Sequence, residues 1–145
     1  MAEVAGVTVL GTGAWGTTLA RLVAEERLRQ AGGDVATADT VLLWDHHADR
    51  AAAMESAREN RDYLPGMMFP PNLRVTGDLA EALRDQALVV FVTPSQRLRE
   101  QAKQAAALLA PGAIVVSASK GLELGTRLRM SQVLQQEMQI GRAHV

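Results

Sequence analysis

The sequence predicts an α/β fold built around a doubly wound parallel sheet, and three observations support this. Short apolar runs rich in β-branched residues alternate with helix-like segments along the chain. Several of these runs are apolar throughout, as in parallel strands that are covered on both faces. The first run leads into a G-x-G-x-x-G turn that opens a helix. Because parallel strands need crossover connections, this alternation favours a sheet with helices on both sides.

The glycine turn lies between the first predicted strand, Val7–Leu10, and a helix predicted over about residues 15–29. Gly11 allows a tight turn, Gly13 lets a pyrophosphate approach the backbone, and Gly16 lets the helix pack against the strand. The helix N-terminus adds free N–H groups and the positive end of its dipole. This order predicts a Rossmann-like dinucleotide site, with a loop that only turns the chain as the alternative.

The remaining elements follow in order. Further strands are predicted at Thr40–Trp44, Leu73–Thr76, Leu88–Val92 and Ala113–Ser117, and helices at residues 50–61, 78–85 and from 95 to about 109. The last of these helices has an apolar stripe that includes Leu98 and Ala102. Three prolines and a glycine exclude a regular element from the loop Tyr63–Asn72.

Composition excludes several classes of protein. The 145 residues suit one domain. With 15 basic and 16 acidic residues, the chain has no net positive charge to attract nucleic acid or an anionic membrane surface. The chain has no cysteine and no apolar run near the roughly 20 residues that span a bilayer. Its first residues lack the features of a signal peptide. We therefore expect a cytoplasmic protein without a membrane or nucleic-acid partner.

The second predicted strand ends in Asp45-His46-His47, with Arg50 close behind. In a dinucleotide fold this strand end meets the adenosine ribose, where a carboxylate suits the ribose hydroxyls and a cation suits a 2′-phosphate. Asp45 favours NAD over NADP, but the histidines and Arg50 offset its charge in part, so both cofactors stay open. A solvated polar turn is the alternative. We expect no metal here, since adjacent histidines seldom point at one ion.

Lys120 follows the last of these predicted strands, and Thr93 and Ser95 follow the strand before it. Ligands of open α/β sheets bind at the carboxyl ends of the strands, so these side chains should share an edge with the glycine turn. A lysine there can hold a phosphate or carboxylate as a point charge. It is also the only convincing proton donor for nicotinamide chemistry. An ordinary surface lysine is the alternative.

Several more specific motifs occur along residues 7–134: Gly11–Ala20, Leu43-Trp44, Asn60 with Tyr63-Leu64-Pro65-Gly66, Phe69-Pro70, Thr76-x-Asp78-Leu79, Val92–Ser95 and Ser119–Glu123. In this order they resemble the N-terminal part of NAD(P)-dependent glycerol-3-phosphate dehydrogenase of the bacterial type. The Lys-Gly-Leu-Glu step and the Tyr-Leu-Pro loop are more specific than the glycine fingerprint.

The resemblance implies an oxidoreductase that reduces dihydroxyacetone phosphate to sn-glycerol 3-phosphate with NAD or NADP, for phospholipid synthesis. By position, Ala14 and Trp15 match contacts of the cofactor diphosphate, and His46 and His47 match contacts of the adenosine ribose. Lys120 matches a lysine that touches both cofactor and substrate. The family usually has serine at position 14, a small residue at 45 and often arginine at 46. These departures leave only a backbone contact at Ala14 and keep the cofactor preference open.

The family also has an all-helical second domain that carries the catalytic lysine, and this sequence holds no counterpart of it. We therefore expect no catalytic residue in this chain and no turnover by the chain alone. The resemblance also implies a homodimer as the full-length form. Residues 1–139 should form an NAD(P)-binding domain truncated at its C-terminal end. Residues 140–145 do not resemble the family and match one reading frame of a common sequencing-adapter oligonucleotide, which predicts a non-native tail.

Two other functions stay open at this point. The first is a stand-alone dinucleotide-binding module without catalysis. The second is a related two-domain reductase that acts on ketopantoate or a 3-hydroxy acid, although the loop Tyr63–Gly66 argues against it.

Overall fold

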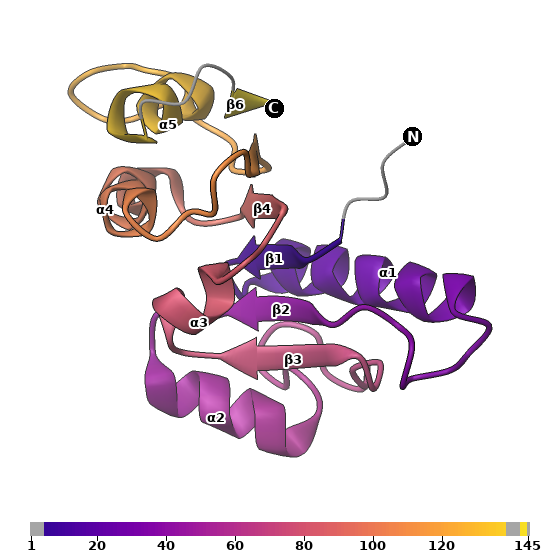
Figure 1. The fold of residues 1–145 in the computed structure, drawn as a ribbon. Coiled ribbons are helices and arrows are strands. Elements are labelled where there is room, and N and C mark those ends of the chain that lie inside the picture. Colours follow the sequence, from indigo (N-terminus) through magenta and orange to yellow (C-terminus); the bar gives the residue numbers. More distant parts are fainter. Residues whose placement is uncertain (1–4, 139–142, 145) are drawn as a thin grey trace.

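A parallel sheet with the strand order β3-β2-β1-β4-β5-β6 forms the centre of the computed structural model, which describes residues 5–138 and 143–144 (Figure 1). The strands are β1 (Val7–Leu10), β2 (Val41–Trp44), β3 (Leu73–Thr76), β4 (Leu88–Phe91), β5 (Ile114–Ser117) and β6 (Ala143–His144). Every neighbouring pair is parallel, and Val7 of the central strand pairs with both Val41 and Leu88. The predicted doubly wound α/β fold is confirmed.

The helices cover both faces of this sheet. They are α1 (Ala14–Gln30), α2 (Ala48–Ala57), α3 (Leu79–Leu83), α4 (Ser95–Ala106) and α5 (Met130–Met138). Helices α4 and α5 pack against each other beside the β4–β5 half of the sheet (Figure 1). None of the helices in the described part of the chain is long and apolar enough to cross a bilayer.

Two apolar cores lie on the two faces, because successive residues of a strand point to opposite sides. Val9 and Leu43 join residues of α1 and α2 in one core. Leu10 and Phe91 join α3, α4 and α5 in the other. Strands buried on both faces explain why the apolar runs of the sequence show no alternation with polar residues.

Helix α2 ends earlier than the sequence predicts. It stops at Ala57 instead of residue 61, because Arg58 takes a left-handed conformation with φ of 58°. The Arg58 guanidinium then donates to the backbone carbonyl oxygens of Pro70 and Leu73, at 2.9 and 2.7 Å. The helix is thus cut short where its last arginine anchors the irregular loop ahead of β3.

The C-terminal residues are described only in part. Residues 140–142 and 145 of the expected non-native tail lie outside the described residues. Ala143 and His144 form β6 and pair with Val115 and Val116 of β5. The expectations of a truncated domain over residues 1–139 and a non-native tail stay predictions.

A substitution of Leu98 on α4 tests how much the core formed with α3, α4 and α5 contributes to stability. Its side chain is fully buried among residues of β4, β5 and α5. We expect Leu98→Ala to lower the free energy of unfolding by about 2–5 kcal/mol, measured by urea denaturation, because it leaves a cavity in a packed core. Leu124→Ala, at a side chain that is 79% exposed, is the control and should change little. Equal effects in both variants would contradict this packing.

Candidate cofactor site

A cleft of about 1070 Å³ opens at the carboxyl ends of β1, β2, β4 and β5. It lies where the strand order reverses, between β1 and β4, which is where open α/β sheets bind their ligands. Seven of the nine predicted cofactor residues line it: Gly11, Gly13, Trp15, Asp45, His46, His47 and Lys120. The other two, Ala14 and Gly16, lie in the first turn of α1.

The three glycines of the turn have three different surroundings. A Cβ atom on Gly11, whose φ is +128°, would lie 2.2 Å from the carbonyl oxygen of Val92. A Cβ on Gly16 would lie 2.1 Å from the carbonyl oxygen of Gly11. A Cβ on Gly13 would meet no atom of the described residues within 4 Å. Gly11 and Gly16 therefore permit close backbone packing, whereas Gly13 keeps the cleft side of the turn open.

The N-terminus of α1 faces this open side. Gly13 is the N-cap residue, and it has no side chain that could cap the first turn. The first helical hydrogen bond runs from the Thr17 N–H to the Gly13 carbonyl oxygen, at 3.0 Å. The first turn holds no acidic residue. Its N–H groups and the helix dipole together suit an anion such as a diphosphate.

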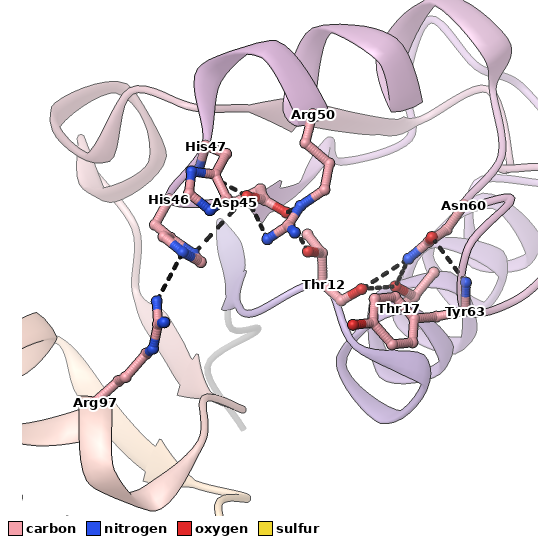
Figure 2. Close-up of polar contacts among 9 residues, drawn as sticks. All are labelled: Thr12, Thr17, Asp45, His46, His47, Arg50, Asn60, Tyr63 and Arg97. Carbon is pink, nitrogen blue, oxygen red and sulfur yellow. Dashed lines mark hydrogen bonds and ion pairs between the residues drawn. The ribbon is translucent and has the colours of Figure 1, made fainter.

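The Asp45 carboxylate is buried in the cleft wall, and other residues of the chain hold it in place (Figure 2). Arg50 donates to both of its oxygens, at 2.7 and 3.1 Å, and the Thr12 hydroxyl and the His47 N–H also donate to it. Burial alone would raise the pKa of Asp45, but these hydrogen bonds outweigh it and lower the pKa below its usual value. A ribose hydroxyl would have to displace one of these donors, so the predicted ribose contact of Asp45 stays a prediction.

His46 and His47 lie side by side at the end of β2, with ring centroids 4.0 Å apart. The Arg97 guanidinium reaches from α4 to within 3.0 Å of the His46 Nε2 atom (Figure 2). Desolvation lowers the pKa of His46, and the nearby charges of His47, Arg97 and Arg50 lower it further against the opposing effect of Asp45. No three metal-ligating side chains gather anywhere in residues 5–138 and 143–144.

Asn60 fixes the glycine turn from the opposite side (Figure 2). Its buried amide nitrogen donates to the Thr12 carbonyl oxygen at 2.7 Å and to the Thr17 hydroxyl at 2.9 Å. Its amide oxygen accepts from the Tyr63 N–H at 3.2 Å. Asn60 thereby joins the glycine turn to the loop that brings Tyr63 to the cleft. The residue pattern alone shows no such role, because its partners lie 43 and 48 positions away.

Lys120 lies at the β5 side of the cleft, in a loop that α4 holds in place. Gln96 bonds the Leu122 carbonyl oxygen and the Leu124 N–H, at 3.0 and 2.9 Å. Arg99 donates to both oxygens of Glu123, and these bonds lower the pKa of Glu123 to about 2. The exposed Lys120 ammonium group is therefore carried on an ordered loop at the expected edge of the sheet.

Thr93 lies beside the same loop, at the end of β4. Its N–H donates to the Ser119 hydroxyl at 2.9 Å. Thr93 lines the cleft, and its buried hydroxyl has no hydrogen-bond partner within the described residues. As predicted, Thr93, Ser95 and Lys120 share one cleft with the glycine turn.

A family model described as NAD-dependent glycerol-3-phosphate dehydrogenase N-terminus matches residues 6–145 of the chain. The chain belongs to this family. The predicted Rossmann-like fold and the resemblance drawn from the sequence motifs are both confirmed.

Individual members of the glycerol-3-phosphate dehydrogenase family agree with this assignment. The chain is 44% identical over 128 residues to glycerol-3-phosphate dehydrogenase (NAD(P)+) of Mycobacterium leprae, covering 88% of this chain and 34% of that protein. It is 42% identical over 141 residues to the Streptomyces coelicolor enzyme, covering 97% and 39%. A crystal structure of the Coxiella burnetii enzyme matches 96% of this chain and 38% of its own, with a TM-score of 0.79 and 28% identity. The chain thus spans 34–39% of the length of these relatives.

Gly13 and Gly16 provide a matched pair of variants for the dinucleotide turn of this family domain. Gly16→Ala places a methyl group against backbone and should destabilise the fold by about 1–3 kcal/mol or more. Gly13, with φ of −67°, accepts alanine at less than about 1 kcal/mol, but the methyl group obstructs the approach of a diphosphate. Thermal unfolding and nucleotide titration should therefore separate the two. A Gly13→Ala chain that unfolds as readily as Gly16→Ala would contradict this account.

Asp45 should make folding stability depend on pH. Because its pKa is lower in the folded chain, its contribution is present above about pH 4 and is lost as the pH falls through the lowered value. We expect Asp45→Asn to cost roughly 1.5–3 kcal/mol at pH 7 and less at pH 3, measured by urea denaturation. Asp49→Asn, at an exposed position, is the control. A cost that stays constant over this range would contradict the ion pair with Arg50.

Proposed function

We propose that this chain is the cofactor-binding part of an NAD(P)-dependent sn-glycerol-3-phosphate dehydrogenase, which reduces dihydroxyacetone phosphate to sn-glycerol 3-phosphate. One observation carries the proposal. The glycine turn and Lys120 line one cleft in a chain that belongs to this family. The turn suits the diphosphate of a dinucleotide, and an ammonium group at the far wall suits a phosphorylated substrate.

The residues of the cleft fit a dinucleotide. In the described part of the chain, the open side of Gly13 leaves room for a diphosphate. The first turn of α1 has no side-chain cap, so its N–H groups can donate to that diphosphate. The unpartnered Thr93 hydroxyl offers a further hydrogen bond on the side of Lys120. When bound, the nicotinamide supplies the hydride.

The chain's own residues orient the reactants. Gly13, Ala14 and Trp15 would hold the diphosphate through backbone N–H groups. The Lys120 ammonium would contact both the cofactor and the substrate as a charged hydrogen-bond donor. Gln96 and Arg99 limit how far the Lys120 loop can move. The remaining catalytic groups are those of the helical second domain that the family resemblance predicts.

Both NAD and NADP are retained as cofactors in this proposal. Asp45 favours NAD when its charge is considered alone, but Arg50 neutralises that charge within the fold. His46, His47 and Arg97 surround the expected ribose position and favour an added phosphate when charged. The homodimeric state of the full-length form and its cytoplasmic location stay predictions.

A titration of the chain with NADH and with NADPH, followed by nicotinamide fluorescence, tests the proposal. We expect both to bind. Lys120→Ala should weaken binding roughly 10-fold or more, the usual cost of a lost charged hydrogen bond. Lys103→Ala, at an exposed lysine on α4, should bind like the parent chain. A chain that is folded by circular dichroism but binds neither nucleotide would rule the proposal out.

A further inference from the structure

Gln101 is a buried polar residue on the face of α4 that borders the cleft. The cleft is lined from α4 and its cap by Pro94, Ser95, Arg97 and Gln101. Pro94, Arg97 and Gln101 have the spacing of one helix face. The adjoining face, with Leu98 and Ala102, is buried in the core. Gln101 is only 8% exposed, so its amide lies between this core and the cleft.

The Gln101 amide oxygen has no hydrogen-bond partner in the part of the chain that the structure describes. Buried amides are nearly always paired, because an unpaired buried polar group is costly. The same is true of three other buried oxygens, of Asn72, Gln86 and Thr93. Asn72 and Gln86 do not line the cleft, and each donates through its amide nitrogen to a carbonyl oxygen. Gln101 therefore stands out as an unpaired buried amide at the cleft wall.

The position of Gln101 relates it to one end of a bound dinucleotide. Arg97, one turn earlier on α4, reaches His46 at the end of β2, which is the strand end that meets the adenosine ribose. Gln101 lies one turn beyond Arg97, on the same face. The base attached to that ribose would thus lie between the His46-His47 turn and the α4 face that carries Arg97 and Gln101.

We propose that Gln101 recognises the adenine base of the cofactor, an inference that rests on the proposed function. A glutamine amide presents an acceptor oxygen beside a donor NH₂ group. The edge of adenine presents the complementary pair, with the 6-amino group as donor and N7 as acceptor. The Gln101 oxygen accepts from the 6-amino group, and its NH₂ group donates to N7. Adenine thereby supplies the hydrogen bond that the buried amide oxygen lacks.

The Arg97 guanidinium and the imidazole rings of His46 and His47 provide planar groups for the faces of the base. Planar cations stack well on aromatic rings. Stacking accepts any purine, so selection of adenine over other purines falls to the edge contact of Gln101.

The test compares NADH with nicotinamide hypoxanthine dinucleotide in its reduced form, in which a carbonyl oxygen replaces the 6-amino group. We expect the parent chain to bind NADH at least about 10-fold more tightly, about 1.4 kcal/mol. Gln101→Met should bind the two nucleotides equally, because its side chain is similar in size but cannot pair with either base. Gln104→Met, at an exposed glutamine on the same helix, should keep the preference of the parent.

The outcomes separate the inference from the proposed function. Equal binding of both nucleotides by the parent chain overturns the adenine contact while leaving the proposed function intact, and this comparison needs no variant. A Gln101→Met chain that loses stability but keeps the preference also overturns it. If a folded parent chain binds neither nucleotide, the proposed function fails and the adenine contact with it.

Discussion

The close packing of the glycine turn is the constraint on which the cleft depends. Gly16 lies so near the Gly11 carbonyl oxygen, and Gly11 so near that of Val92, that neither position has room for a side chain. This contact draws the first turn of α1 against the ends of β1 and β4. The helix N-terminus is thereby aimed at the cleft, and Gly13 is left on its open side. A larger residue at either packed position would move the helix and the anion site together.

Loops carry most of the other cleft residues, and polar side chains from distant elements hold these loops in place. Asn60 joins the glycine turn to the Tyr63 loop, Arg50 holds the turn after β2 through Asp45, and Arg99 holds the loop after β5 through Glu123. Each arginine forms two hydrogen bonds to its carboxylate, the geometry that best restricts an ion pair. The order of the site therefore comes from these long-range contacts more than from regular secondary structure.

The sequence predicts the framework of the domain well and its polar interior poorly. Apolar runs locate the strands because parallel strands are buried on both faces, and glycine spacing locates the turn because backbone contact demands it. The buried ion pair of Asp45 and the central role of Asn60 depend on which distant donors the fold brings near. In the sequence, Gln101 cannot be told apart from the exposed polar residues of its helix, because neighbours on other elements determine its burial. Local patterns contain none of this information.

Helix α4 serves both ends of the cleft at once. Arg97 and Gln101 border the end of the cleft beside β2. Gln96 and Arg99 form hydrogen bonds to the loop that carries Lys120. Its 12 residues form a helix about 18 Å long. A substitution that displaces α4 would therefore alter both walls of the cleft, because this one helix contributes to each of them.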